Sequence, residues 1–170
     1  MILRYKDYLL RNLIQEDKDL IYKWRNLSSI RNMMINTNKI LWSEHNIWFE
    51  NAILKEPELH YIFCYKENPI GYIGYKIEDE KILSPGLYIG EKISSEAGLY
   101  IVAFSIDVAF NILNANTLKT KIKLKNKPSI GISKYMGYKL YCYDDEYYLA
   151  ILNKNEWKHK LGVNFKEYAK

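Results

Sequence analysis

The residues best suited to chemistry lie between positions 83 and 110, in the segment LSPGLYIGEKISSEAGLYIVAFSIDVAF. A β-type run over residues 82–89 leads into a loop of small polar residues, 90–98, which precedes an apolar segment of about four helical turns. Free backbone N–H groups at such a helix start bind anions, and small side chains let a phosphate approach. The glycine motifs G-x-x-x-x-G-K-S/T and G-x-G-x-x-G do not occur. The segment therefore predicts a phosphate-binding loop, but not one of the nucleoside-triphosphate kind.

A second group of candidates lies in predicted helices nearer the N-terminus. The guanidinium of Arg25 can bind phosphate oxygens with two hydrogen bonds, although it can also simply offset a helix dipole. His45 follows Glu44 in the first turn of a predicted helix, where a neutral imidazole either accepts a proton from a substrate ammonium or only hydrogen-bonds. Glu44 is expected to stabilise that helix N-terminus. Met34 and Trp48 either wall a substrate site or, as their helical spacing more often indicates, belong to the core.

Lysines at alternate positions form another charged feature. On a strand they would share one face, with Ile122 and Leu124 on the other. Such a stripe can bind phosphates or nucleic acid, but we favour a solvated face that discourages edge pairing, with contact to a ligand phosphate as a lesser role. The lysines are Lys119, Lys121, Lys123, Lys125 and Lys127.

The composition is that of a globular chain able to bury a core. Of 170 residues, 48% are hydrophobic and 26% charged, and the length fits one domain, residues 1–170. The net charge of +5 suits a polyanionic ligand, although solvated lysines account for much of it. Cys64 and Cys142 sit in apolar strand-like runs without a C-x-x-C spacing, which predicts reduced core residues. The three histidines show no zinc spacing, so no metal is expected.

Targeting and membrane segments are not evident in the sequence. The N-terminal residues lack the apolar run of a signal peptide, and no stretch approaches the ~18 apolar residues of a membrane span. No repeat or low-complexity linker interrupts the chain. We therefore expect a soluble, cytoplasmic protein, a monomer or homodimer, without a membrane partner.

Hydrophobic periodicity, caps and turns predict an α/β chain of mixed α+β character. The segment 16–27 begins with acidic residues and ends with basic residues, a distribution that favours a helix. Ser28 and Ser43 can cap two further helices, at 28–34 and 44–55. Pro85-Gly86 predicts a β-bulge, or only a bent edge strand. The remaining predicted elements are a strand at 8–14, an antiparallel meander at 60–66, 70–77 and 82–89, a buried helix at 98–114, a strand at 117–124, a helix at 128–136 ended by Gly137, and strands at 139–143 and 146–152.

Several short motifs accompany this order of elements. They are Lys23-Trp24-Arg25-Asn26, Glu44-His45 with Trp48, Gly71-Tyr72-Ile73-Gly74, Ala109-Phe110-Asn111, Asn126 with Ser129-Ile130, Met136-Gly137-Tyr138, and Tyr147-Tyr148 with Glu156-Trp157. With the loop after the fourth strand, the chain resembles the GCN5-related N-acetyltransferase superfamily over nearly its whole length. The motifs are similar to one subgroup, the N-acetyltransferases of pseudaminic acid biosynthesis, which acetylate the 4-amino group of a UDP-linked 4-amino-4,6-dideoxy sugar. The resemblance implies a central, mostly antiparallel twisted sheet of about seven strands flanked by helices, with acetyl-CoA as co-substrate.

The resemblance also implies site residues. Of the superfamily loop pattern Arg/Gln-x-x-Gly-x-Gly/Ala only Gly98 is matched, with Ser95 at the Arg/Gln position, so phosphate contacts should rest on backbone N–H groups. The family places a Tyr or His five residues before the motif aromatic, Tyr138; here that position is Ser133, with Tyr135 nearby. The implied catalytic residues are His45, Ser133 and Tyr135. The implied acetyl-CoA contacts are Leu87, Tyr88, Ile89, Ser94, Ser95, Glu96, Ala97, Gly98, Leu99 and Asn126, and the implied acceptor contacts are Arg25, Met34, Glu44, Trp48 and Lys76.

Acetyl transfer from a thioester to an amine needs a neutral amine, a group that polarises the carbonyl and an acid for the leaving thiolate. No Ser-His-Asp or Cys-His arrangement is visible, which agrees with direct attack. We expect a small-molecule amine, a nucleotide-sugar, because the basic chain favours an anionic acceptor. A protein N-terminus, a polyamine and an aminoglycoside are alternatives. Two further alternatives are an inactive acetyltransferase-like domain and a nucleic-acid-binding module on the lysine stripe; the latter lacks the known motifs, so we expect no nucleic-acid partner.

Overall fold

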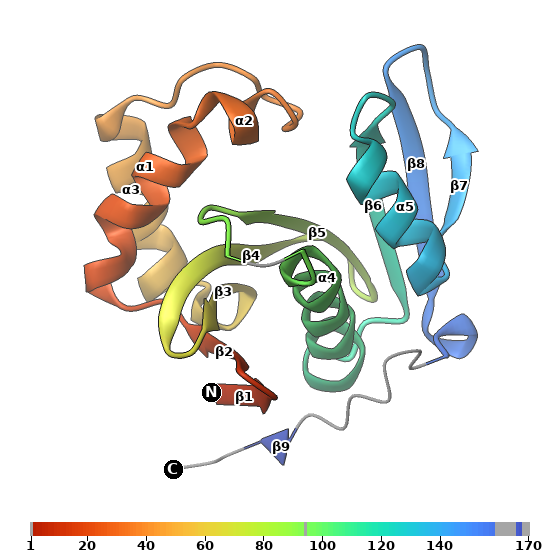
Figure 1. The fold of residues 1–170 in the computed structure, drawn as a ribbon, viewed down its shortest axis with the longest axis horizontal. Helices are drawn as coiled ribbons and strands as arrows, with labels where there is room; N and C mark the ends of the chain where they lie inside the picture. The colour runs from red at the N-terminus through yellow and green to blue at the C-terminus, as the bar shows by residue number, and fades with distance from the viewer. Residues whose placement is uncertain (1, 94, 159–165, 168–170) are drawn as a thin grey trace. The chain divides into compact units, whose positions relative to one another are not determined.

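The computed structural model describes residues 2–93, 95–158 and 166–167, and the chain divides into two compact units (Figure 1). The first unit consists of Met1–Gly74, Tyr88–Ile93 and Phe165–Lys170, and the second of Tyr75–Leu87 and Ser94–Asn164. Strands β4 (Asn68–Asp79) and β5 (Ile82–Ile89) each contribute residues to both units. The expectation of a single domain stays a prediction.

The sheet of the first unit is antiparallel, with strand order β4-β3-β2-β1-β9. Its strands are β1 (Ile2–Tyr5), β2 (Tyr8–Asn12), β3 (His60–Tyr65), the first part of β4, and β9 (Lys166–Glu167). The sequence analysis missed β1 and β9 because segments of four and two residues are too short to show a period of two.

Three helices belong to the first unit: α1 (Lys18–Asn26), α2 (Ser28–Arg31) and α3 (Trp42–Leu54). The predicted caps are wrong, because Ser28 and Ser43 lie inside the first turns of α2 and α3, and the N-cap positions are leucines. At the start of α3 the Glu44 carboxylate accepts the Leu41 N–H at 2.9 Å instead. This bond confirms the expected role of Glu44 in stabilising the helix N-terminus.

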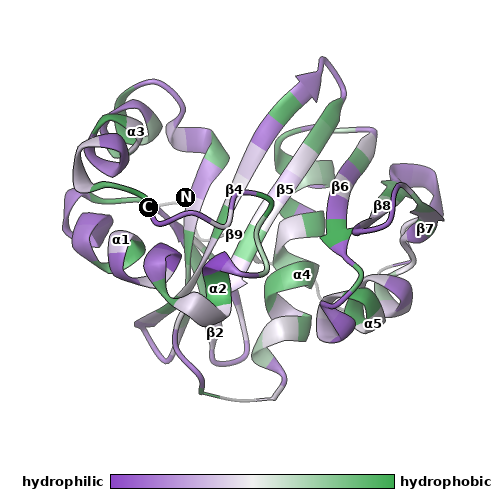
Figure 2. Ribbon diagram, turned by 90° about the horizontal axis from the view of Figure 1, so that it is seen from above, coloured by the Kyte–Doolittle hydropathy of each residue, from purple (hydrophilic) through white to green (hydrophobic). Residues whose placement is uncertain are grey.

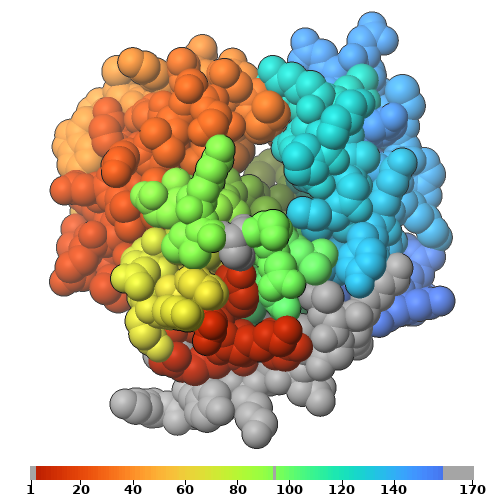
Figure 3. Space-filling model, viewed as in Figure 1, coloured from red at the N-terminus to blue at the C-terminus, as the bar shows by residue number. Residues whose placement is uncertain are grey.

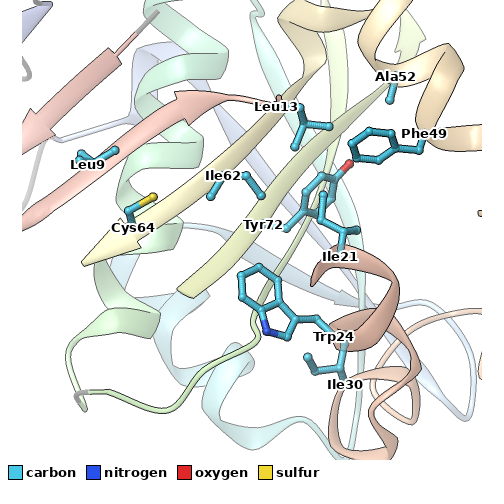
Figure 4. Close-up of a cluster of buried hydrophobic side chains, with 10 residues drawn as sticks. All are labelled: Leu9, Leu13, Ile21, Trp24, Ile30, Phe49, Ala52, Ile62, Cys64 and Tyr72. Carbon is cyan, nitrogen blue, oxygen red and sulfur yellow. The ribbon is translucent and has the colours of Figure 1, made fainter. Parts of the chain in front are cut away.

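The core of the first unit lies between these helices and strands β2, β3 and β4 (Figure 4). Trp24 of α1, Phe49 of α3 and Ile62 of β3 are each 0% exposed. Burial of such large apolar side chains holds α1 and α3 against the sheet, and so fixes the polar residues that these helices carry. The clustered residues are Leu9, Leu13, Ile21, Trp24, Ile30, Phe49, Ala52, Ile62, Cys64 and Tyr72.

The second unit contains helix α4 (Ala97–Asp107), which continues as a π-helical segment, Val108–Ile112. Figure 2 shows α4 coloured largely as hydrophobic, and most of its side chains are buried, as the apolar run predicts. The predicted polar stripe is present, since the Asn111 side-chain amide donates to the Asp107 carboxylate at 2.6 Å. The helix is therefore largely buried, and its polar groups lie in one stripe and at its N-terminal end.

The strands of the second unit follow the order β7-β8-β6-β5. β6 (Thr117–Lys123) pairs in parallel with β5 and antiparallel with β8 (Tyr147–Asn153), which also pairs antiparallel with β7 (Lys139–Cys142). Helix α5 (Lys127–Met136) connects β6 to β7, and its side chains share the face seen in Figure 3 with those of the β7–β8 hairpin. The predicted mixed α+β class with a mostly antiparallel sheet is confirmed.

Two expectations about polar residues need correction. Cys64 is a free, fully buried core thiol, as predicted, but Cys142 is free and exposed on β7. The lysine stripe is not a uniform solvated face, because Lys121 Nζ lies 3.7 Å from the centre of the Tyr143 ring and Lys123 is only 8% exposed. Within the described ranges, no helix is both long and apolar enough to cross a membrane.

Gly137 ends α5 as predicted, with φ of +99° and its N–H donating to the last turn of the helix. Replacing Gly137 by Ala should lower the free energy of unfolding by about 1 kcal/mol, because a Cβ disfavours this left-handed conformation. Chemical denaturation measures the change. Gly131→Ala is the matched control: a Cβ on Gly131 of α5 meets nothing within 4 Å, so that variant should gain about 0.5–1 kcal/mol. Equal changes in the free energy of unfolding for Gly137→Ala and Gly131→Ala would show that the left-handed conformation of residue 137 carries no cost.

Candidate functional site

The N-terminus of α4 presents backbone N–H donors in the second unit. The N–H groups of Leu99 and Tyr100 donate to the Glu96 carbonyl at 2.9 and 3.1 Å. The N–H groups of Ala97 and Gly98 precede them and therefore have no acceptor within the helix. Two such donors at the positive end of a helix dipole suit an anion, as the sequence predicts.

Side chains around this helix end are small or point outward. Ser95 and Glu96 are exposed, Leu99 is half-buried, and Ala97 is 2% exposed. A Cβ on Gly98 would lie 3.2 Å from Ile132 Cδ1 of α5, so glycine permits the close packing of α4 on α5. The sequence-predicted contact Ser94 lies outside the described residues.

Glu96 is the one charged side chain among the loop residues 95–99, and it carries the same sign as a phosphate. Replacing Glu96 by Gln should tighten binding of a phosphate-bearing donor about two- to five-fold at low salt, because a like charge is removed from the helix end. Calorimetric titration with acetyl-CoA measures this. Glu80→Gln, at an exposed turn of the same unit, is the charge-matched control. Equal tightening in both variants would show that only net charge matters.

Strand β5 spans Ile82–Ile89 and includes Pro85-Gly86, and the predicted bulge at these two residues stays a prediction. The parallel pairing of β5 with β6 is confined to Ile82 with Thr117 and Leu83 with Leu118. It stops before Pro85, which has no N–H to donate, and the Thr120 hydroxyl instead donates to the Pro85 carbonyl at 3.2 Å. The parallel ladder with β6 therefore ends before the proline. The predicted donor contacts Leu87, Tyr88 and Ile89 follow it as half-buried residues.

Helix α5 and its ends carry the other predicted residues of the second unit. The Asn126 side chain caps α5 by accepting the Ser129 N–H at 3.3 Å, which leaves its amide NH₂ as the group able to reach a ligand. Ser133 is buried at 6% exposed, whereas Tyr135 is 48% exposed. Burial raises the pKa of Tyr138, so its phenol stays protonated at neutral pH. Of these hydroxyls, that of Tyr138 is buried and stays protonated, and that of Tyr135 is largely open to solvent.

In the first unit, the three residues Trp24-Arg25-Asn26 each hold another segment in place. Trp24 Nε1 donates to the Glu91 carboxylate at 2.9 Å, and its ring covers Gly90, where a Cβ would lie 2.2 Å from an indole carbon. The Asn26 side chain exchanges two hydrogen bonds with the backbone of Ile40. The motif thus fixes both the end of β5 and the loop before α3.

Arg25 is half-buried at the end of α1 and is only partly satisfied. Its Nη2 donates to the Asn36 carbonyl at 2.9 Å, while Nη1 is buried and has no hydrogen-bond partner in the part of the chain that the structure describes. Burial lowers the Arg25 pKa, against the opposing influence of the Tyr88 hydroxyl. A fixed cation with an unused buried N–H is suited to an anionic group of a ligand.

His45 proves to be a packing residue. It is 2% exposed, and its Nε2 donates to the Lys18 carbonyl of α1 at 2.8 Å. Its ring lies against aromatic side chains of α1 and α3, and burial lowers its pKa. This environment joins the two helices; the predicted role of His45 as a proton acceptor stays a prediction, and the proton acceptor proposed below is a different residue of this unit.

The other predicted acceptor contacts are dispersed. Met34 and Trp48 are half-buried against the core of the first unit. Glu44 is exposed and bonded to Leu41, as described above. Lys76 belongs to the second unit, where its exposed ammonium lies 3.1 Å from Glu78. Only Arg25 among these residues has an unused buried donor.

The sequence analysis overlooked a buried polar pair, His60 and Tyr72, whose side chains lie 2.7 Å apart in the first unit. Tyr72 was noted only as part of a motif, and the alternating Gly-Tyr-Ile-Gly pattern was the one available signal. Among the described residues, no group of three or more His, Cys, Asp or Glu side chains could hold a metal ion.

Comparisons with known proteins agree with this arrangement, although no protein-family model matches the chain. The acetyltransferase PseH of Campylobacter jejuni is 25% identical over 146 residues, which are 86% of this chain and 92% of that protein. The crystal structure of C. jejuni N-acetyltransferase PseH in complex with acetyl coenzyme A matches with a TM-score of 0.68 at 22% identity, over 86% of this chain and 99% of that one. Spermidine N-acetyltransferase from Vibrio cholerae, in complex with CoA and spermine, matches with a TM-score of 0.76 at 13% identity, over 88% and 97%.

Proposed function

Since the chain belongs to the GCN5-related N-acetyltransferase superfamily, we propose that it transfers the acetyl group of acetyl-CoA to the 4-amino group of a UDP-linked 4-amino-4,6-dideoxy sugar. The superfamily and fold class expected from the sequence are confirmed, and the enzyme is an acetyltransferase. The nucleotide-sugar acceptor is supported by the similarity to PseH and by the charge of Arg25.

The second unit is suited to the donor. The backbone N–H groups of Ala97 and Gly98, in the first turn of α4, would hold the pyrophosphate of CoA. The Asn126 amide NH₂ and Leu87 of β5 would bind the pantetheine arm. The bound donor supplies an activated acetyl thioester, and the protein supplies binding, orientation and protons.

The single observation that carries the acceptor assignment is the unpaired, buried Nη1 of Arg25. Leaving a buried guanidinium N–H without a partner is costly, and a diphosphate oxygen would satisfy it with a charged hydrogen bond. A polyamine would be repelled by this cation, and the net charge of +5 also favours an anionic acceptor.

The chemistry requires few groups. The acceptor amine must lose its proton, attack the thioester carbonyl directly and displace the CoA thiolate. The buried, protonated Tyr138 is the proposed donor of the proton that the thiolate takes, in place of Ser133, whose alkyl hydroxyl is a much weaker acid.

A panel of acceptors tests the proposal. Release of the CoA thiol is followed with acetyl-CoA and, in turn, the UDP-linked amino sugar, spermidine and an aminoglycoside. The proposal expects the highest kcat/KM for the nucleotide-sugar. A higher kcat/KM for spermidine or the aminoglycoside would mean that this amine, and not the nucleotide-sugar, is the acceptor. Binding of acetyl-CoA without turnover of any amine would indicate an inactive domain.

A further inference from the structure

His60 and Tyr72 form a buried polar pair that the donor and acceptor contacts above do not use. His60, the first residue of β3, is 6% exposed, and Tyr72 of β4 is 8% exposed. His60 Nδ1 lies 2.7 Å from the Tyr72 hydroxyl oxygen. Trp48 packs edge-on against both rings, with centroids 5.7 and 5.9 Å away. In such an apolar enclosure the hydrogen bond is strong, and each partner would be costly to bury alone.

The backbone is arranged so that these two rings can meet. His60 pairs with Gly74 across the β3–β4 ladder, and Gly74 lies on the same face of β4 as Tyr72, two residues away. A Cβ on Gly74 would lie 2.2 Å from the Tyr72 hydroxyl oxygen. A larger residue at position 74 would therefore displace the phenol, so the Gly-Tyr-Ile-Gly pattern builds the pair.

The surroundings of His60 set its tautomer. Nε2 is buried without a hydrogen-bond partner and lies 3.7 Å from the carboxylate of Glu56, which is 58% exposed. The carboxylate favours a proton on Nε2, which leaves Nδ1 to accept the Tyr72 O–H. Burial lowers the pKa of His60 below 6.5, although Glu56 and Glu58 oppose the shift, so the ring is neutral at neutral pH.

Tyr72 connects this pair to the anchor proposed for the acceptor. Its ring stacks on Tyr88 at a centroid distance of 5.4 Å, and the Tyr88 hydroxyl lies in the field of Arg25. Burial, with smaller contributions from Tyr88 and Glu56, raises the pKa of Tyr72, so the phenol keeps its proton until a base takes it. The titratable groups that face the pair are thus Glu56, Glu58 and Tyr88, whereas α3 contributes the uncharged Trp48.

Resting on the proposed acetyl transfer, we propose that Tyr72, His60 and Glu56 form a relay for the proton that the acceptor ammonium must lose. The Tyr72 oxygen takes that proton, directly or through one water, while the Tyr72 hydroxyl proton passes to His60 Nδ1. The resulting imidazolium gives its Nε2 proton to Glu56 and so to solvent. The amine is left neutral with a free lone pair, and no group is oxidised or reduced. After product release, His60 Nε2 takes a proton from solvent through Glu56, and Nδ1 returns its proton to the Tyr72 oxygen. Tyr72 in turn releases the proton taken from the acceptor to the water that replaces the product, which restores the starting tautomer.

The tautomer is tested on the wild-type chain without any acceptor. Two-bond proton–nitrogen NMR of the histidine rings should show His60 as the neutral Nε2–H form at neutral pH, titrating below the ordinary value of 6.5. Tyr72→Phe should shift the Nδ1 resonance, because the hydrogen bond to Nδ1 is lost. An Nδ1–H tautomer, or an imidazolium at neutral pH, would overturn the relay.

Kinetics test the function of the pair. In the wild type, kcat/KM should fall as the pH drops through the lowered pKa of His60, because the imidazolium cannot accept a proton. His60→Gln and Tyr72→Phe should each lower kcat about 100-fold and remove that acid limb. The double variant should be no worse than either single variant, because both break one path. Two additive losses with an unchanged acid limb would mean that the pair is merely structural.

Matched control variants distinguish a proton relay through His60 and Tyr72 from a role of these residues in packing alone. His45→Gln removes the other buried histidine with a lowered pKa, and Tyr61→Phe removes another buried phenol of β3; both should keep the acid limb. Glu56→Gln should weaken turnover only a few-fold, since that side chain is largely exposed. If the wild type acetylates no nucleotide-sugar, the acceptor proposal fails by itself, and the relay is then decided by the NMR tautomer and by the pH profile with whichever amine is acetylated.

Discussion

Replacing Arg25 by Gln should lower kcat/KM for the UDP-linked amino sugar roughly 30- to 150-fold, mainly through a higher KM. The guanidinium is held by the Asn36 carbonyl through Nη2, and its buried Nη1 has no hydrogen-bond partner among the described residues. Charged hydrogen bonds from it to a diphosphate would contribute about 2–3 kcal/mol, most of which an uncharged amide loses. Steady-state kinetics at several salt concentrations measure the effect, and the wild type should show the steeper salt dependence.

Two comparisons decide whether Arg25 binds phosphate or only holds the loop before α3. Asn26→Ala removes both hydrogen bonds to Ile40 in the same loop but no charge, so it should leave the salt dependence of KM unchanged. An acceptor amine without a diphosphate should be acetylated almost equally by wild type and Arg25→Gln. A large loss with that uncharged acceptor would mean that Arg25 acts by supporting the loop.

Replacing Gly90 by Ala should be the most destabilising single-methyl change in the first unit, at about 3 kcal/mol. The added Cβ would lie 2.2–2.4 Å from three indole carbons of Trp24. That ring is 0% exposed and hydrogen-bonded to Glu91, so it cannot swing aside as a flexible side chain would. Thermal unfolding should show a drop in Tm of roughly 6–12 °C for a chain of this length.

Gly86→Ala is the matched control for this prediction. Gly86 lies on β5, which ends one residue before Gly90; it is exposed and would place its Cβ more than 4 Å from any neighbour. Its unfolding free energy should stay within about 0.5 kcal/mol of the wild type. In a Trp24→Phe background the cost of Gly90→Ala should shrink, because the smaller ring leaves room. Equal stability of the Gly86 and Gly90 variants would show that the indole does not constrain position 90.

The elements that the sequence predicts well are those with strong local signals. The apolar run of α4, the span of β5 and the left-handed end of α5 at Gly137 all follow from periodicity or from a single residue's backbone preference. The caps at Ser28 and Ser43 were wrong because capping depends on where the helix starts, and the apolar contacts of the core set those starts one or two residues earlier.

The candidate site was predicted less completely, since burial and partners are tertiary properties. Nothing local distinguishes His45, which bonds to a carbonyl of α1, from His60, which bonds to a phenol across the sheet. The unused donor on Arg25 is equally invisible in the sequence, because it arises from how the loop before α3 folds back onto α1. Backbone donors at the start of α4, in contrast, follow from the strand–loop–helix order alone.

The most direct test of the central claim follows the acetyl group itself. Purified protein is incubated with isotopically labelled acetyl-CoA and the UDP-linked 4-amino-4,6-dideoxy sugar, and NMR locates the label in the product. The account predicts an amide on the 4-amino nitrogen, formed in step with release of the CoA thiol. Label found only in free acetate or unreacted acetyl-CoA, with the nucleotide-sugar unchanged, would contradict it.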